Sequence, residues 1–374
     1  MIALAAVGLL LNVYILTEAF EALVLPRRVT HPYRFTRLYY QAAWRVWRIA
    51  ARVFRVPRHQ QTVLSIFGPL SLLVLFALWA IGLIFGFGVM HHAIAPRPAV
   101  FWESVYLSGT TFTTLGYGDV TPTTPTARVL SVVEAATGFG YFAVVIAYLP
   151  VLHQTFSRRE AFIALLDARA GSPPAAGRML LRTPPTVEGH RTLGAFLAEA
   201  ERWAAEVLEG HLSFPVVGYY RSQHDNQSWL AALACVLDSC ALVLTVVEGA
   251  DRNQARLTFA MARHTVVDLG LVLRRPPQAP AEERLPESRL GDLLTALKTA
   301  GVKIRDDAST RSKLLELRGL YEPFIAGLAT YFRIVVPVVW PTDEHPDNWQ
   351  TSAWMRRADP LHALEATRDD DHFD

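Results

Sequence analysis

The chain has 374 residues, 51% of them hydrophobic, and a formal net charge of +2 at pH 7. This length leaves room for a membrane part and one or two further domains, and so hydrophobic a composition is unusual for a wholly soluble protein. The small net charge decides little by itself, because the placement of the charges matters more. The two cysteines, Cys235 and Cys240, exclude a disulfide framework and a zinc site, and are typical of reduced thiols in a cytosolic domain.

Three apolar stretches in the first 152 residues are long enough to cross a bilayer, which takes roughly 20 residues of helix. They are 1–25, 62–90 and 129–152. For the first stretch a signal peptide is the alternative. However, it lacks a basic start and continues through Glu18 and Glu21 into Pro26, with no small-residue cleavage site. We therefore expect a retained N-terminal membrane helix, 1–25.

The segment 26–60 contains nine arginines and no acidic residue, whereas the loop 91–125 contains a single arginine, Arg97. Positive charge accumulates on the cytoplasmic side of membrane proteins. The asymmetry therefore predicts an external N-terminus, a cytoplasmic first loop, an external second loop, and a cytoplasmic chain from residue 158 onward. We accordingly expect a multi-pass protein of the plasma or inner cell membrane.

Six of these arginines recur at intervals compatible with one face of a helix: Arg34, Arg37, Arg45, Arg48, Arg52 and Arg55. A basic face beside Trp and Phe is typical of an interfacial helix on an anionic leaflet, with Arg45, Arg48, Arg52 and Arg55 toward the lipid. A voltage-sensing helix is the alternative, because arginines 52, 55 and 58 have the required spacing. A sensor also needs acidic partners in the membrane, and only Glu18 and Glu21 are available, so the interfacial helix is favoured.

Between the second and third apolar stretches, the segment 101–113 tolerates a helix but is too short to span a membrane. Irregular backbone at membrane depth is stable only where it is buried in protein or lines a water-filled path. We therefore expect a re-entrant pore helix, 101–113, and an extended loop, 114–118. Both belong to a pore unit, 61–157, with an outer helix, 62–90, and an inner helix, 126–152.

The extended loop reads Thr114-Leu115-Gly116-Tyr117-Gly118. A pore that passes dehydrated K⁺ replaces the ion's water with stacked rings of oxygen. Successive backbone carbonyls face one side only with backbone angles that are open mainly to glycine, and here glycine alternates with larger residues. One such strand encloses nothing, so the pattern predicts a selectivity filter in a homotetramer.

The loop and its flanks resemble the signature of the potassium-channel pore family, in the form Thr111-x-x-Thr114-x-Gly116-Tyr117-Gly118-Asp119. The resemblance covers roughly residues 65–150. It implies that K⁺ is bound by the carbonyls of Thr114, Leu115, Gly116 and Tyr117 and by the Thr114 hydroxyl. It also implies that Trp102, Thr111 and Asp119 support the filter. Leu115 departs from the family, which more often has Val or Ile there, and this leaves the wall packing open.

The inner helix contains Gly138 and Gly140 near its middle, where each lowers helix stability by about 1 kcal/mol relative to alanine. They are interpreted either as gating hinges or as points of close packing against the pore helix. Pro150 is expected to kink the helix at its cytoplasmic end, with Tyr148 and its neighbours forming a constriction. Glu134 is expected to form hydrogen bonds behind the filter or to be protonated, because an unpaired charge at membrane depth is costly.

The remainder, 158–374, is expected to form a mainly helical cytoplasmic regulatory domain, with breaks at 171–185 and 274–286. Helical periodicity covers 193–212, 228–270, 289–300 and 312–339. The apolar segments 229–247 and 321–340 could touch the membrane, but Asp238 and Arg333 favour buried core helices. No dinucleotide fingerprint or catalytic motif occurs in the chain. His264 and Asp268 could share a metal ion, although a plain polar pair is favoured, and 369–371 is expected to be a disordered acidic tail.

The sequence therefore predicts an α-helical membrane protein with an outer helix–pore loop–inner helix core, an extra N-terminal membrane helix and a mainly α cytoplasmic domain. The expected function is passive K⁺ flux, gated at the inner helices. The alternatives are a tetrameric anchor for a cytoplasmic enzyme or scaffold, a K⁺ transporter, and a weakly selective cation channel. Expected partners are further copies of the chain, K⁺, anionic lipids and an unidentified cytoplasmic ligand, with no nucleic acid, no organic cofactor and no enzymatic activity.

Overall fold

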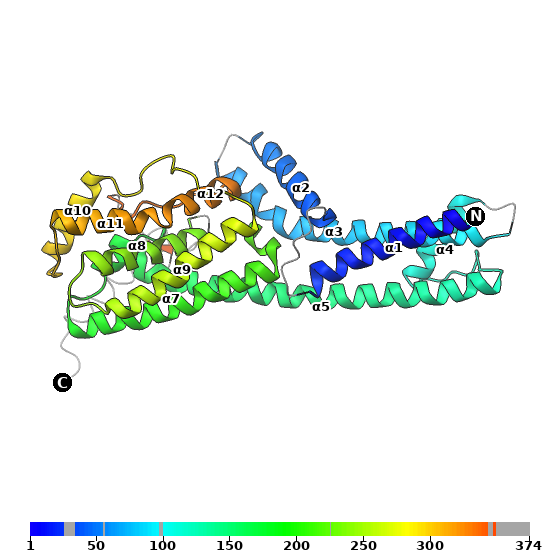
Figure 1. Cartoon of the computed structure of the whole chain (residues 1–374), viewed down its shortest axis with the longest axis horizontal. Helices are drawn as coiled ribbons and strands as arrows, with labels where there is room; N and C mark the ends of the chain where they lie inside the picture. The colour runs from blue at the N-terminus through cyan, green and yellow to red at the C-terminus, as the bar shows by residue number, and fades with distance from the viewer. Residues whose placement is uncertain (26–33, 55–56, 97–99, 225, 343–346, 349–374) are drawn as a thin grey trace, which may run out of the picture. The chain divides into compact units, whose positions relative to one another are not determined.

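The computed structural model describes residues 1–25, 34–54, 57–96, 100–224, 226–342 and 347–348. This described part is helical, and its one β-type pairing is an isolated antiparallel bridge between Val247 and Ile304. The chain divides into two compact units, Met1–Thr155 and Phe156–Asp374 (Figure 1). The expected α-helical membrane protein is confirmed.

Three of the described helices are long and apolar enough to cross a membrane, two of them wholly within the first unit and the third continuing from it into the second. They are α1 (Ile2–Leu23), α3 (Pro57–Ile94) and α5 (Pro125–Ala170), and α4 (Phe101–Phe112) is the short helix between the last two. Helix α5 is longer than the expected 126–152. It remains helical through Gly138, Gly140 and Pro150 and ends only where Gly171 adopts φ +85°. A left-handed glycine followed by proline is a common helix terminus.

Helix α1 packs closely on α3 through small residues. A Cβ atom on Gly8 would lie 2.5 Å from the Gly86 carbonyl oxygen, and one on Gly86 would lie 2.1 Å from the Asn12 amide group. Asn12 is buried, and the orientation of its amide that satisfies both ends donates to the Leu83 carbonyl and accepts from the Phe87 backbone amide, both at 3.2 Å. Small residues and a shared polar group are what brings membrane helices together, so α1 is an integral part of the first unit.

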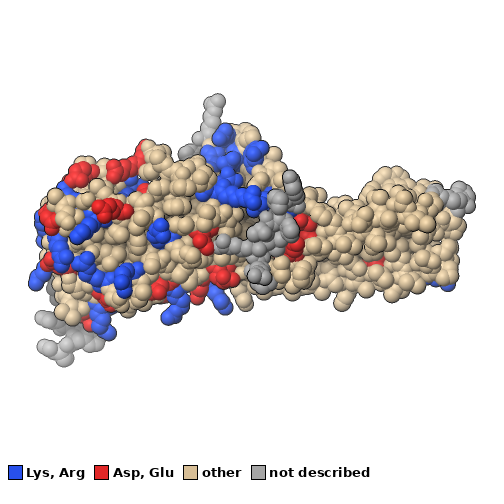
Figure 2. Space-filling model, in the orientation of Figure 1, with Lys and Arg blue, Asp and Glu red and all other residues tan. Residues whose placement is uncertain are grey.

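Helix α2 (Phe35–Ala51) packs on α3 with one face. Trp44 is buried against Phe67 at 4.8 Å between ring centroids, and the Trp47 indole N–H donates to the Val63 carbonyl. The rest of α2 leaves both basic and apolar side chains exposed, and Lys and Arg gather over it in Figure 2. Exposed examples are Arg45, Arg52, Leu38, Val46 and Ile49.

The two acidic residues of α1 lie at the start of α2. Glu18 accepts hydrogen bonds from the Thr36 backbone amide at 3.2 Å and from its hydroxyl at 2.9 Å, and Glu21 pairs with Arg34 at 3.4 Å. A carboxylate at a helix N-terminus satisfies a free amide and complements the helix dipole. The burial of Glu18 is therefore explained by its contacts at the start of α2. Arg55 lies outside the described residues.

The second unit is a bundle around α8 (Trp229–Thr245) (Figure 1). The other helices are α6 (Ala176–Leu181), α7 (Val187–Ser213), α9 (Arg252–Val272), α10 (Glu287–Thr299), α11 (Ala308–Gly319) and α12 (Glu322–Phe332), with a 3₁₀ turn at Pro215–Tyr219. Side chains at the N-caps Thr186, Ser228, Asp251 and Asp307 accept backbone amides, as such residues commonly do. Every residue of α8 except Leu244 is buried, which explains its apolar composition without a membrane.

The helical periodicity over 312–339 does not correspond to one helix. The segment is divided into α11 and α12 at Gly319, and α12 ends at Arg333, which adopts φ +54°. The residues from Ile334 to Thr342 are not helical, so 321–340 does not form a span. Similarly, 228–270 is two helices separated by a turn in which Gly249 has φ +81°. Periodicity alone missed these breaks, because apolar residues continue on both sides of each turn.

Candidate functional site

The loop after α4 turns its backbone amides toward the end of that helix. The amide of Thr114 donates to the Thr111 carbonyl at 3.0 Å, and those of Leu115 and Gly116 donate to the Thr110 carbonyl at 2.8 and 3.2 Å. These carbonyls belong to the last turn of α4 and have no partner within the helix. Among the described residues, no donor contacts the carbonyl oxygens of residues 114–117. The amides are satisfied on one side, while the carbonyls are left for another partner.

The handedness of the same loop alternates from residue to residue. Thr114 and Gly116 have φ +56°, Gly118 has φ +81°, and the intervening Leu115 and Tyr117 do not have positive φ. Alternating left- and right-handed residues turn successive amides to one side and successive carbonyls to the other. A Cβ atom on Gly116 would meet no atom within 4 Å in the chain, so φ, not space, is what requires glycine there. The left-handed Thr114 was not expected from sequence, because threonine rarely adopts this conformation.

The residues expected to support the filter are only partly brought together within one chain. Asp119 accepts a hydrogen bond from the Tyr106 hydroxyl at 2.9 Å, a contact that the sequence interpretation missed. Trp102 is 69% exposed and Tyr117 is 71% exposed, so neither forms a wall behind the loop in a single chain. Thr111 contributes its backbone carbonyl to the loop. The sequence offered one signal for this bond: the chain after residue 118 runs back past α4, the helix that carries Tyr106.

A buried polar cluster joins the three elements around the loop. The Glu134 carboxylate of α5 accepts a hydrogen bond from the Ser108 hydroxyl of α4 and lies 2.9 Å from Nε2 of His91 in α3. All three side chains are at most 2% exposed. The Ser108 hydroxyl also lies 2.7 Å from the Ile84 carbonyl. The expected hydrogen bonding of Glu134 is present, and its His91 partner, 43 residues away, could not be identified from sequence.

The two glycines of α5 differ in their surroundings. A Cβ atom on Gly138 would lie 2.0 Å from the Phe112 carbonyl oxygen at the end of α4, whereas one on Gly140 would meet nothing within 4 Å. Close packing against the pore helix therefore accounts for Gly138. Helix α5 is continuous at both positions.

Replacing Gly138 with alanine is expected to destabilise the first unit by about 3 kcal/mol, because a backbone carbonyl must move to admit the methyl group. Thermal denaturation of the detergent-solubilised chain measures the effect. Gly140→Ala is the matched control and should be neutral or slightly stabilising, by up to about 1 kcal/mol. Equal denaturation midpoints for the two variants would contradict the packing explanation.

The side chains expected at the constriction do not all face outward. Tyr148 is 8% exposed and packs edge-on against Phe76 of α3, with 5.9 Å between ring centroids, and Leu152 is 2% exposed. Both are thereby withdrawn from the open face of the helix that a gate requires. Leu149 and Pro150 are exposed. Tyr148 and Leu152, four residues apart, lie on the same face of α5, and Tyr148 contacts α3 through Phe76.

The other face of α5 is apolar and uncovered. Its exposed side chains include Val129, Val132, Val133, Phe139, Val144, Ile146 and Val151. Leu115 of the loop is also 54% exposed. An apolar surface of this extent is covered by lipid or by other protein chains in a native membrane protein.

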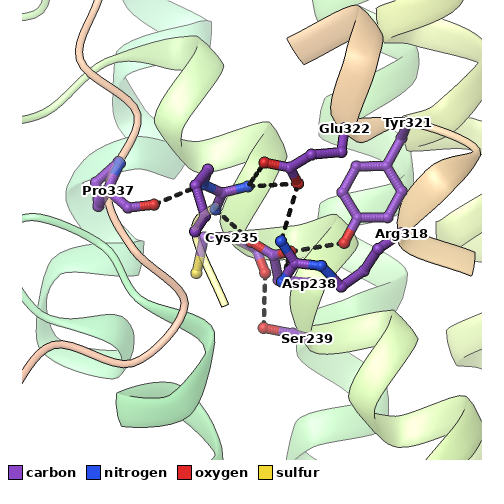
Figure 3. Close-up of polar contacts among 8 residues, drawn as sticks. Cys235, Asp238, Ser239, Arg318, Tyr321, Glu322 and Pro337 are labelled. Carbon is purple, nitrogen blue, oxygen red and sulfur yellow. Dashed lines mark hydrogen bonds and ion pairs between the residues drawn. The ribbon is translucent and has the colours of Figure 1, made fainter. Parts of the chain in front are cut away.

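The most connected polar cluster of the second unit lies against α8 (Figure 3). Asp238 accepts hydrogen bonds from Tyr321 at 2.6 Å and from Arg284 at 2.5 Å, and Glu322 pairs with both Arg284 and Arg318. The two carboxylates balance the two guanidinium groups, and a closed network of this kind offsets much of the penalty for burying charge. It explains the aspartate inside the most apolar helix of the unit and indicates a structural role.

The remaining candidate residues of the second unit do not form a site. Cys235 and Cys240 are free, buried thiols, and burial raises the pKa of Cys235 to about 12. His264 and Asp268 are 3.8 Å apart on α9, and His264 is largely exposed. In the described part of the chain, no group of three His, Cys, Asp or Glu side chains could hold a metal ion.

Comparison with known proteins agrees with this arrangement. The model of a family described as "Ion channel" matches residues 71–152, which include most of α3, all of α4, the loop and the first part of α5. The chain is 22% identical over 240 residues to the uncharacterized membrane protein YdjJ of Bacillus subtilis (strain 168), covering 62% of this chain and 69% of the relative. No solved structure gives a significant match.

The fold, the loop and the matched family together define a class: this is a membrane-embedded protein that contains an ion-channel domain. The match supports conduction of cations and favours a transport function over an enzymatic one.

Proposed function

We propose that this chain is one subunit of a homotetrameric potassium channel and that K⁺ crosses the membrane passively through the filter 114–118. The observation that best supports this is the filter backbone. Its handedness alternates, the amides of residues 114–116 are bonded to α4, and four successive carbonyls have no donor among the described residues. Stacked carbonyl oxygens are the groups that replace the hydration shell of K⁺.

Four copies around one axis would complete what a single chain leaves open. The filter residues are exposed, and so are Leu115, Tyr117 and Trp102 beside it, together with the apolar face of α5. A closed ring would cover these surfaces and set four filters face to face. We place the gate on α5, at Leu149 instead of Tyr148, and assign regulation to the second unit.

The proposed channel is tested by reconstituting the purified full chain in liposomes and measuring currents under opposing K⁺ and Na⁺ gradients. The expected reversal potential lies near the K⁺ equilibrium potential. A reversal potential near zero would identify a weakly selective cation channel. Absence of current from correctly assembled protein would favour a membrane anchor and would overturn the proposal.

For α2 we propose an interfacial position on the cytoplasmic leaflet, where exposed Arg45 and Arg52 lie beside exposed Val46 and Ile49. Each arginine near an anionic surface contributes about 1 kcal/mol. Replacing Arg45, Arg48 and Arg52 with glutamine should therefore reduce the dependence of channel activity on anionic lipid. Currents recorded across a series of phosphatidylglycerol contents check this, and a shifted voltage dependence with unchanged lipid dependence would refute it.

A further inference from the structure

Three arginines of the second unit gather at the C-terminal end of α12 without an acidic partner in the described part of the chain. They are Arg221, Arg275 and Arg333. By contrast, the buried arginines 159, 284 and 318 each lie within 4 Å of a carboxylate. Arg221, Arg275 and Arg333 are half-buried and, unlike these three fully buried arginines, have no carboxylate within 4 Å among the described residues.

Arg221 and Arg333 are held close together by the end of the helix. The Arg221 guanidinium donates to the carbonyls of Phe332 and Arg333 at 2.5 and 3.3 Å. Burial and the neighbouring charge of Arg333 lower the pKa of Arg221 to about 10, so the Arg221 guanidinium remains charged at neutral pH. The carbonyls at a helix end carry about half an elementary charge, which offsets only part of this positive charge.

Arg275 reaches the same helix end from the chain that follows α9. Its guanidinium lies 3.9 Å from the centroid of the Tyr331 ring. The segment is fixed along α12, because the Gln278 amide donates to the Pro323 carbonyl at 2.9 Å and a Cβ atom on Gly327 would lie 2.6 Å from the Pro276 carbonyl. Arg275 is therefore positioned by its backbone, and the cation–π contact is worth roughly 0.5–2 kcal/mol.

Two guanidinium nitrogens of the cluster are buried without a hydrogen-bond partner: Nε of Arg275 and Nη1 of Arg333. Buried donors are almost always satisfied, and an exception commonly indicates a missing ion or water. Here the unsatisfied donors belong to charged groups, for which loss of water is most costly. An anion bound at this end of α12 would supply acceptors for such donors and would offset part of the positive charge.

We propose that Arg221, Arg275 and Arg333 form a binding site for a phosphate-bearing anion at the C-terminal end of α12. Phosphate matches the guanidinium forks, which bind its oxygens in pairs, and its two negative charges suit a cluster of three cations. The anion is either a soluble phosphate compound or the headgroup of a phospholipid. Anion binding does not depend on conduction, so a negative binding result would not contradict the proposed channel function, and absence of current would not contradict the proposed site.

Equilibrium dialysis of the detergent-solubilised full chain with radiolabelled pyrophosphate tests the site directly. We expect saturable binding, weakened at least about tenfold by Arg333→Gln and by Arg275→Gln, since each removes a charge-assisted contact. Arg333→Lys retains the charge without the fork and should weaken binding less than glutamine. Arg169→Gln is the matched control, because Arg169 also lies over an aromatic ring and donates to a carbonyl, but lies outside the cluster.

Competition distinguishes the two sources of the anion. Displacement of pyrophosphate by dioctanoyl phosphatidic acid at lower concentration than by inorganic phosphate would indicate a lipid headgroup, and the reverse order a soluble ligand. The thermal denaturation midpoint of each unliganded variant shows whether it is folded. Equal pyrophosphate binding by folded wild-type, Arg333→Gln and Arg275→Gln chains, or no saturable binding by the wild type to either class of phosphate, would overturn the proposal.

Discussion

Gly116→Ala is expected to abolish K⁺ conduction while leaving the chain folded and assembled. Residue 116 has φ +56°, and a side chain there is strained although no atom lies within 4 Å of the Cβ position. An L-residue in this conformation costs roughly 1–2 kcal/mol, and the proposed tetramer contains four copies. The strain is relieved by rotating the peptide, which turns a carbonyl out of the alternating arrangement that the ion needs.

The measurement is K⁺ flux from liposomes containing the variant, which we expect to fall at least about 100-fold, as four strained copies imply. Size-exclusion chromatography must show unchanged assembly. Gly291→Ala is the control, because Gly291 of α10 also has no atom near its Cβ position but lies in a helix without positive φ. Normal flux through Gly116→Ala would mean that the backbone at this position does not line the ion path.

Glu134→Ala is expected to cause the largest loss of stability in the first unit. It removes the common partner of Ser108 and His91, which are both buried. Removing one member of a buried pair typically costs about 3–5 kcal/mol, because the other is left without compensation. The three elements joined by this carboxylate lie around the loop 114–118, which we propose as the filter, so conduction should fall together with stability.

Thermal denaturation of the solubilised chain, followed by K⁺ flux, separates the two effects. Glu134→Gln keeps a side chain that can accept from Ser108 and should retain more stability than alanine. Glu103→Ala is the control, since Glu103 lies exposed in the first turn of α4 and should change stability by less than about 1 kcal/mol. If Glu134→Ala denatured at the same temperature as Glu103→Ala, the cluster would have no structural role.

The features that could be predicted from sequence are those that depend on a short piece of chain. Apolar length identified the three membrane-spanning helices. The spacing of Gly116 and Gly118 anticipated an alternating backbone, because only glycine adopts positive φ without strain. Pro323 and the left-handed Arg333, in contrast, divide a region whose periodicity suggested one helix. The apolar periodicity there favours a helix while Gly319 and Pro323 favour a break, and the pattern alone does not show which of the two prevails.

The partners of buried polar groups were decided by the tertiary structure. Glu134 required a partner at membrane depth, but whether that would be His91, Ser108 or a proton depends on which helices meet. Asp238 required compensation within an apolar helix, and it comes from Arg284 and Tyr321, 46 and 83 residues away. Likewise, the sequence allowed Gly138 to be a hinge or a point of close packing, and the Phe112 carbonyl, which leaves no room for a Cβ atom, shows that it is closely packed.

The sequence by itself thus determined the class of backbone at the filter and the number and order of the membrane helices. Both follow from side-chain polarity and φ freedom, which are properties of each residue and its immediate neighbours. The tertiary structure decided that α1 packs on α3 at Asn12, that Tyr148 contacts α3, and that three arginines lie at the end of α12 with no carboxylate partner among the described residues. These arrangements depend on contacts between segments distant in sequence, which close packing selects only when the whole unit is assembled.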